Sequence, residues 1–232
     1  MAKIKKETFK DLLAELQSKA VTTSKPVATI EERQYFLIVC EGARTEPIYF
    51  DYWKRFLPNH LLETVQIIGQ GDNTINVVRK AIEEKKARAA DPVKPPFDEV
   101  WAVFDKDDFP NERFDNAVSL AEQNGINNGS SNQAFELWYV LHFQFLQTAI
   151  NRGDYFSILS KKLGFKYGKN DIRVVEALFE KGNFRQAIEW AKELRKMHDG
   201  KTPSTSCPST NVYKLVERLL IYFNIKKPIE KN

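Results

Sequence analysis

The first two thirds of the chain alternate between short apolar runs and longer amphipathic stretches. Residues 35–40 (YFLIVC) and 100–104 (VWAVF) are uninterrupted apolar runs, which are typical of strands buried on both faces. Weaker strand candidates lie at residues 64–68 and 126–131, and the second is polar enough to indicate an edge or distorted strand. Each run precedes a helical pattern, so the expected helices are residues 45–57, 74–90, 110–123 and 134–147. Such alternation predicts an α/β fold with a mainly parallel, four-stranded sheet flanked by helices.

Two further parts flank this alternating region. Residues 1–19 have the spacing of an amphipathic helix, with Phe9 and Leu12 on one face, and residues 21–32 form a connector. No strand pattern follows Gly153, where the expected helices are residues 155–163, 171–181, 183–198 and 212–223. The chain therefore divides into an N-terminal helix and connector (1–32), a core (33–150) and a helical extension packed on the core (151–232).

Composition excludes several classes of protein. Hydrophobic residues make up 42% of the 232 residues, enough for a core, but no apolar run approaches the length of a membrane span. Cys40 and Cys207 are the only cysteines, so neither a disulfide framework nor a zinc-binding cysteine spacing is present. Because the N-terminus also lacks an apolar signal core, we expect a cytoplasmic protein without membrane contact.

Charge changes this picture only slightly. Lys and Arg total 35 against 31 Asp and Glu, a mild excess that permits a polyanionic partner without requiring one. One basic run in the extension either follows a nucleic-acid backbone or forms a solvated face; its members are Lys161, Lys162, Lys166, Lys169 and Arg173.

Acidic residues directly follow the two strongest strand candidates. Glu41 comes after the first apolar run, and Asp105 and Asp107 come after the second. In an open parallel sheet, ligands bind beyond the carboxyl ends of the strands, so we expect these side chains at one edge. Extended backbone through Lys106 would point both aspartates to the same side. Converging carboxylates without His or Cys ligands favour Mg²⁺ or Mn²⁺, ions that can activate water and polarise a phosphodiester.

Acidic and polar residues near strand ends also have structural explanations. A lone strand-end carboxylate usually lies in solvent or caps the next helix, but carboxylates at two strand ends together favour a metal site. Asp108 is either an auxiliary ligand or a charge at a helix N-terminus, and Glu46 fits a helix start better than a site. Arg44 either binds phosphate or lies at the surface. Thr210 and Asn211 either contact a phosphate or act as ordinary helix N-caps.

Three strings in the sequence resemble the RloB-like family. They are residues 39–50 (VCEGARTEPIYF), 103–108 (VFDKDD) and 131–143 (SNQAFELWYVLHF), and the similarity extends to residues 208–215 (PSTNVYKL). RloB-like proteins are similar to Toprim-fold proteins linked to bacterial restriction loci and abortive infection. The resemblance implies that residues 33–150 form a Toprim-like catalytic core, followed by a C-terminal helical extension.

The resemblance also implies roles for particular residues. Glu41 would act as the general acid–base, and Asp105 and Asp107 would form the metal pair. Glu136 would be a further metal-linked carboxylate, where the alternative is a buried helix cap or ion pair. The candidate metal ligands are Glu41, Asp105, Asp107, Asp108 and Glu136. The candidate substrate-binding residues are Arg44, Lys106, Ser131, Asn132, Thr210 and Asn211.

The implied activity is hydrolysis of phosphodiesters in DNA or RNA, transfer RNA included, by a nuclease of bacterial antiphage defence that uses Mg²⁺ or Mn²⁺. The implied partners are nucleic acid and a partner ATPase or another protein of the defence locus, and the oligomeric state stays open. One alternative is a non-catalytic nucleic-acid-binding or regulatory subunit that retains the fold. Another is nucleotidyl transfer, which would need a nucleotide-binding loop, and residues 69–72 (GQGD) are too short for one.

Overall fold

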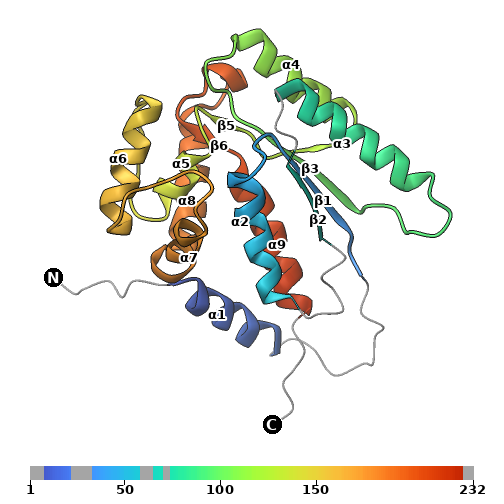
Figure 1. Cartoon of the computed structure of the whole chain (residues 1–232), viewed down its shortest axis with the longest axis horizontal. Coiled ribbons are helices and arrows are strands. Elements are labelled where there is room, and N and C mark those ends of the chain that lie inside the picture. The colour runs from blue at the N-terminus through green and yellow to red at the C-terminus, as the bar shows by residue number, and fades with distance from the viewer. Residues whose placement is uncertain (1–7, 22–32, 58–64, 70–73, 227–232) are drawn as a thin grey trace.

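A four-stranded parallel sheet forms the centre of the molecule (Figure 1). The computed structural model describes residues 8–21, 33–57, 65–69 and 74–226. The strands are β1 (Phe36–Cys40), β2 (Val65–Gly69), β3 (Glu99–Val103) and β4 (Asn127–Asn128). Their order is β2-β1-β3-β4, and every neighbouring pair is parallel. The predicted α/β architecture is confirmed, and it is consistent with a Toprim-like fold.

Helices connect the strands and make up most of the remaining chain. Those of the first part are α1 (Phe9–Val21), α2 (Thr45–Trp53), α3 (Thr74–Ala89), α4 (Asn111–Gln123) and α5 (Glu136–Leu141). Those of the extension are α6 (Arg152–Leu163), α7 (Ile172–Lys181), α8 (Phe184–Met197) and α9 (Val212–Lys226). Short 3-10 turns are η1 (Lys54–Phe56) and η3 (Pro203–Thr205). The predicted helices are found at these positions, although α5 is shorter than predicted. Residues 1–7 of the first predicted helix lie outside the described residues.

Alternate residues of the central strands face two different layers. On β1, Phe36 and Ile38 belong to one hydrophobic cluster, whereas Leu37 and Val39 belong to the other. Helices α3 and α4 cover the second face, and α2, α5 and α9 contribute to the first (Figure 1). Burial on both faces explains why β1 and β3 are continuous apolar runs in the sequence.

The N-terminal helix and the helical extension share the larger hydrophobic cluster with the sheet. Phe9 of α1 packs its ring against Phe179 of α7 and Phe184 of α8, with ring centroids 4.6 Å apart in both pairs. Tyr222 of α9 packs against Phe36 of β1 at 5.1 Å. The extension is therefore attached to the sheet layer by aromatic packing, which fixes its position relative to the strand ends.

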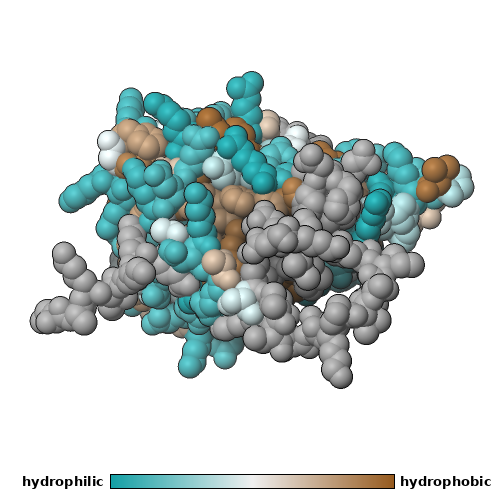
Figure 2. All heavy atoms as spheres, turned by 90° about the horizontal axis from the view of Figure 1, so that it is seen from below, coloured by the Kyte–Doolittle hydropathy of each residue, from teal (hydrophilic) through white to brown (hydrophobic). Residues whose placement is uncertain are grey.

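The surface is mainly polar where it can be seen. Figure 2 shows a face on which hydrophilic residues predominate around a smaller hydrophobic area near the middle. The exposed large hydrophobic residues of the described chain are Val93, Ile172, Met197 and Ile221. Single exposed apolar side chains are normal on protein surfaces. Within the described ranges, no helix is long and apolar enough to cross a membrane.

Helix α5 is shorter than the sequence predicts. The apolar pattern predicts a helix over residues 134–147, but α5 ends at Leu141. The carbonyl of His142 accepts a hydrogen bond from the backbone N–H of Asn183 at 3.0 Å. The Nδ1 atom of the His142 ring forms a hydrogen bond with the carbonyl of Trp138 at 2.8 Å. Burial lowers the pKa of His142 to about 4, so the packed ring is neutral. A tertiary contact with the start of α8 ends the helix, and local periodicity cannot reveal such a contact.

A second, two-stranded sheet corrects the prediction for the extension. Strand β5 (Ser131–Asn132) pairs antiparallel with β6 (Ser209–Thr210), so the prediction that the chain after Gly153 is entirely helical is wrong. The predicted fourth strand is split, because β4 has only two residues and Ser131 forms a separate parallel bridge with Asp105. The short strands are polar and pair with segments distant in the sequence, so no apolar pattern predicts them.

Buried polar side chains hold this second sheet in place. The hydroxyl groups of Ser131 and Thr210 lie 3.0 Å apart across the strand pair. The Nδ2 of Asn132 donates to the carbonyls of Pro203 and Ser204, at 3.1 and 2.8 Å. These two hydrogen bonds connect η3 to the core. Asn132 is only 3% exposed, and its amide donors are occupied within the chain.

Replacing Asn132 by Asp tests this structural role. The variant keeps the side-chain shape but directs a carboxylate at two carbonyls, and leaving a buried polar group unsatisfied costs about 1–3 kcal/mol. We expect urea unfolding, followed by circular dichroism, to show a free energy of unfolding lower by about 2 kcal/mol or more. The control Asn127→Asp, at an exposed position on β4, should change it by less than about 0.5 kcal/mol. Wild-type stability of the Asn132 variant would refute the role.

Candidate functional site

The carboxyl ends of β1 and β3 place two acidic residues side by side. Cys40 lies opposite Val103 in parallel register, and the N–H of Glu41 extends this pairing by donating to the Val103 carbonyl at 2.8 Å. Oε2 of Glu41 accepts a hydrogen bond from the backbone N–H of Asp105, also at 2.8 Å. The structure therefore brings Glu41 and Asp105 together at the edge of the sheet where ligands bind in open α/β folds.

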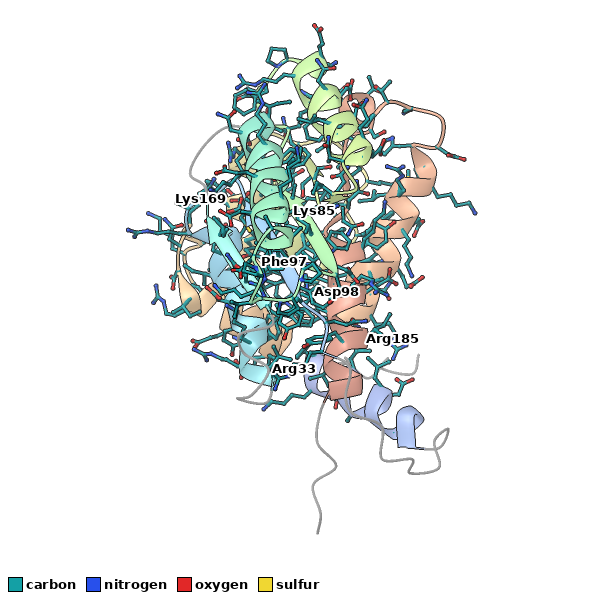
Figure 3. All side chains as sticks on the ribbon, turned by 90° about the vertical axis from the view of Figure 1, so that its right-hand side faces the viewer. Arg33, Lys85, Phe97, Asp98, Lys169 and Arg185 are labelled. Atoms are coloured by element: carbon teal, nitrogen blue, oxygen red, sulfur yellow. The ribbon has the colours of Figure 1, made fainter. Side chains whose placement is uncertain are left out.

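A cavity of about 340 Å³ opens beyond these strand ends. Its walls come from the loops after β1 and β3, the starts of α2, α5 and α6, and the loop between α6 and α7. In Figure 3, Lys169 of that last loop lies above Asp98. Asp98 directly precedes β3, so it marks the end of this strand that lies away from the cavity. Five carboxylates line the cavity: Glu41, Glu46, Asp105, Asp107 and Glu136. The cavity is also lined by three cationic side chains, Arg44, Arg152 and Lys169. If all eight charged side chains are ionised, the cavity has two negative charges in excess.

Asp105 is buried at the cavity wall, with one carboxylate oxygen lacking a partner. Oδ2 accepts a hydrogen bond from the backbone N–H of Phe135 at 3.0 Å, whereas Oδ1 has no partner among the described residues. Burial, together with the charges of Glu46 and Glu136, raises the pKa of Asp105 well above its usual value. A buried carboxylate oxygen without a donor is a position that a cation can stabilise.

Glu41 has a pKa close to neutrality. Burial raises its pKa to about 7, and the negative charges of Asp107 and Glu46 add to the effect. Hydrogen bonds from the Asp105 N–H and from the Thr74 hydroxyl, at 3.4 Å, act in the opposite direction. A carboxyl group with this pKa can accept a proton and release it again near pH 7.

Asp107 reaches the same cavity through a turn of the backbone. Its φ angle is 46°, in the left-handed region that few residues other than glycine adopt, and its N–H donates to the Gln133 carbonyl at 3.0 Å. Its Oδ1 forms an ion pair with Nη1 of Arg152 at 2.8 Å. Burial raises the pKa of Asp107, and the guanidinium opposes that shift. Asp105 and Asp107 thus line one cavity, and the backbone leaves the extended conformation at Asp107 itself.

Glu46 and Glu136 are two further buried carboxylates, 6% and 1% exposed. Burial raises the pKa of Glu46, and the charge of Glu136 adds to that shift. Glu136 accepts a hydrogen bond from the Tyr167 hydroxyl at 3.0 Å and lies 3.7 Å from the ammonium of Lys169. Gly42 leaves room for Glu46, because a Cβ at this position would lie 2.0 Å from Oε2 of that carboxylate.

Several residues that the sequence suggests for the site lie outside the cavity lining. Arg44 lines the cavity, but the other substrate-binding candidates do not: Lys106, Ser131, Asn132, Thr210 and Asn211. Lys106 donates from Nζ to the Phe109 carbonyl at 3.0 Å, and the others lie in or beside the second sheet. Asp108, a candidate metal ligand, is exposed and also lies outside the lining.

The helical extension contributes residues that the sequence pattern does not single out. Arg152 stands at the start of α6, and Lys169 and Asn170 lie in the loop before α7. The Thr45 hydroxyl donates to Oδ1 of Asn170 at 3.1 Å, which connects this loop to the start of α2. Lys169 belongs to the basic run, whereas nothing in the local sequence distinguishes Arg152. Glu46, for which the pattern favours a structural role, could have been found from the family-like string that contains it.

The chemistry of the cavity suits a hard divalent cation. Its acidic side chains offer oxygen ligands, and no His or Cys side chain of the described chain lines it. Oxygen ligands favour Mg²⁺ or Mn²⁺. The unpartnered Oδ1 of Asp105 and the two excess negative charges also fit such an ion. As the side chains stand, no three His, Cys, Asp or Glu side chains of the described residues form a ready-made metal site. A metal ion in the cavity would therefore require some of these side chains to move.

The raised pKa values predict how the metal-free protein responds to pH. Glu41 and Asp105 bind protons more tightly in the folded than in the unfolded protein, so their ionisation lowers stability as pH rises toward about 7. Asp105→Asn removes one charge and keeps an acceptor for the Phe135 N–H. In EDTA at about pH 8, we expect its Tm to exceed the wild-type Tm by about 2 °C or more, with a smaller difference at about pH 5.

Thermal melts followed by circular dichroism measure this difference. The matched control, Glu112→Gln, removes an exposed carboxylate of α4 and should leave the Tm within about 1 °C of wild type. A lower Tm for Asp105→Asn at the higher pH would show that the carboxylates do not repel one another in the folded protein.

Comparison with known proteins places the chain in a family. The model described as RloB-like protein matches residues 36–219, which contain the sheet, most of the extension and every residue that lines the cavity. No curated protein matches the chain, and no solved structure does. Because the family model covers more than half of the sequence, this protein belongs to the RloB-like family.

Proposed function

We propose that this protein is a divalent-metal-dependent nuclease that hydrolyses phosphodiesters of DNA or RNA. The observation that carries the proposal is the cavity at the ends of β1 and β3, in which five carboxylates outnumber three cations. Such a cavity repels the phosphate backbone of a nucleic acid unless a cation neutralises the carboxylates. Metal-dependent hydrolysis therefore explains the charge pattern better than phosphate binding by side chains alone.

Each charged residue of the cavity has a role that follows from its surroundings. Asp105, with its unpartnered Oδ1, and Asp107 hold Mg²⁺ or Mn²⁺, and Glu136 supports them from the cavity wall. When bound, such an ion polarises the phosphodiester and lowers the pKa of bound water. Glu41, with a pKa of about 7, accepts the proton of the attacking water. The exposed guanidinium of Arg44 binds a substrate phosphate.

The biological setting of this activity belongs to the same proposal. DNA and RNA share the phosphodiester backbone on which metal-dependent hydrolysis acts, so both, transfer RNA included, are candidate substrates. A role in bacterial antiphage defence and a partner ATPase or other defence-locus protein follow from what the family resemblance implies. The cytoplasmic location that the sequence predicts belongs to the same proposal.

A non-catalytic nucleic-acid-binding or regulatory subunit is the alternative. Exposed lysines on and after α6 favour it, since such residues can follow a phosphate backbone; they are Lys161, Lys162 and Lys166. A binding module, however, has no use for buried carboxylates that repel one another and destabilise the metal-free fold. The carboxylate cluster therefore favours the nuclease.

Cleavage assays separate these two functions. Plasmid DNA, single-stranded DNA and bulk transfer RNA are incubated with the protein in Mg²⁺, in Mn²⁺ and in EDTA. We expect metal-dependent cleavage of at least one substrate, and rates lower by at least about 10²-fold for Glu41→Gln and Asp105→Asn. The control Glu112→Gln should cleave at the wild-type rate. Cleavage that persists in EDTA, or that both substitutions leave unchanged, is incompatible with the nuclease mechanism.

Metal affinity should depend on pH in a direction set by Glu41. Its carboxyl group has a pKa of about 7 and lies beside Asp105, so below that pH it is neutral and its charge no longer helps to attract the ion. Calorimetric titration with Mn²⁺ should show affinity that rises between about pH 6 and about pH 8, with proton release into the buffer. Glu41→Gln should flatten this dependence. A wild-type affinity that does not change with pH would show that the charge of Glu41 does not contribute to metal binding.

A further inference from the structure

Arg152 pairs directly with a proposed metal ligand. Its Nη1 lies 2.8 Å from Oδ1 of Asp107, and the two side chains are 39% and 24% exposed. The backbone of Arg152 is fixed at the first turn of α6, where the N–H of Asn151 donates to Oδ2 of Asp154 at 3.2 Å. The long side chain thus reaches into the cavity from a rigid position.

This ion pair is weak enough to be exchanged. Ion pairs between partly exposed side chains contribute little to stability, because both side chains lose freedom when they pair. The pair of Lys169 with Glu136 differs, because the Glu136 side chain is only 2% exposed. This carboxylate also accepts a hydrogen bond from Tyr167. A divalent ion carries twice the charge of a guanidinium, so it can replace Arg152 at Asp107.

We infer that Arg152 stands in for the divalent cation at Asp107 and is released to bind substrate phosphate when the ion binds. In the metal-free protein the guanidinium offsets the charge of Asp107, and a bound cation repels it. The released guanidinium stays anchored at the start of α6 and is suited to a bidentate contact with a phosphate group. Arg152 therefore couples metal binding to nucleic-acid binding. The inference rests on the proposed function and identifies a substrate-binding residue within it.

Arg44 provides the matched comparison. It lines the same cavity, but no carboxylate of the described residues forms an ion pair with its guanidinium. The guanidinium of Arg44 is therefore available to a phosphate whether or not a metal ion is bound. Comparing the two arginines distinguishes a specific exchange from the general effect of removing one positive charge from the cavity.

The first measurement is the affinity for Mn²⁺ in the absence of nucleic acid, obtained by calorimetric titration. Arg152→Gln removes the competing guanidinium and should bind Mn²⁺ about fivefold more tightly than wild type, the factor expected from an ion pair of about 1 kcal/mol. Arg44→Gln removes the same charge without removing a competitor, so its gain should stay below about twofold. Equal gains in the two variants would overturn the inference.

The second measurement is the affinity for nucleic acid, with and without a metal ion. Fluorescence anisotropy uses labelled single-stranded DNA and labelled transfer RNA in EDTA and in Ca²⁺, which takes the same oxygen ligands. Electrophoresis confirms that each probe is intact. Arg152→Gln should weaken binding about tenfold in Ca²⁺ and less than about twofold in EDTA. Arg44→Gln should weaken it by a similar factor in both conditions. A metal-independent loss in Arg152→Gln would overturn the inference.

A conservative variant and the wild type separate the remaining outcomes. Arg152→Lys keeps the charge but loses the bidentate geometry, so it should bind Mn²⁺ as wild type does and still lose metal-dependent affinity for nucleic acid. If wild type binds Mn²⁺ and cleaves nucleic acid while Arg152→Gln behaves like Arg44→Gln, only the inference fails. If wild type binds no divalent ion, the proposed function fails and the inference with it.

Discussion

Mutual repulsion between buried carboxylates is the constraint on which this site depends. Hydrogen bonds hold the acidic side chains in place, from the N–H groups of Asp105 and Phe135 and from the hydroxyls of Thr74 and Tyr167. These donors stabilise negative charge without neutralising it, so the pKa of Glu41 still lies near 7. Protons and side-chain cations therefore offset the charge when no metal ion is bound, and this makes the cavity attractive to a divalent cation.

The charges of the cavity come from two parts of the chain. The sheet core supplies all five carboxylates and Arg44, whereas the helical extension supplies Arg152 and Lys169. Aromatic packing of α1 on α7 and α8, and of α9 on β1, brings these parts together. The extension therefore contributes counter-ions as well as apolar contacts. A core that ended before α6 would carry the same acids with less compensation.

Local patterns predict the fold where burial alone decides the structure. Strands β1 and β3 are apolar runs because they are buried on both faces, and the carboxyl-terminal positions of Glu41 and Asp105 follow from parallel topology. Prediction fails where distant contacts decide. Helix α5 ends just before His142, whose carbonyl accepts a hydrogen bond from the N–H of Asn183. The polar strands β5 and β6 form only because they pair with each other. The left-handed backbone of Asp107 and the approach of Arg152 likewise depend on tertiary structure, which periodicity does not contain.

The central claim is that the cavity holds a divalent cation against Asp105. Anomalous X-ray diffraction from crystals grown with Mn²⁺ tests it most directly, because the signal locates the ion without reference to activity. We predict an anomalous peak inside the cavity, in contact with Oδ1 of Asp105, and no such peak in crystals of Asp105→Asn. Wild-type crystals that contain Mn²⁺ only at surface positions, with no peak in the cavity, would contradict the claim.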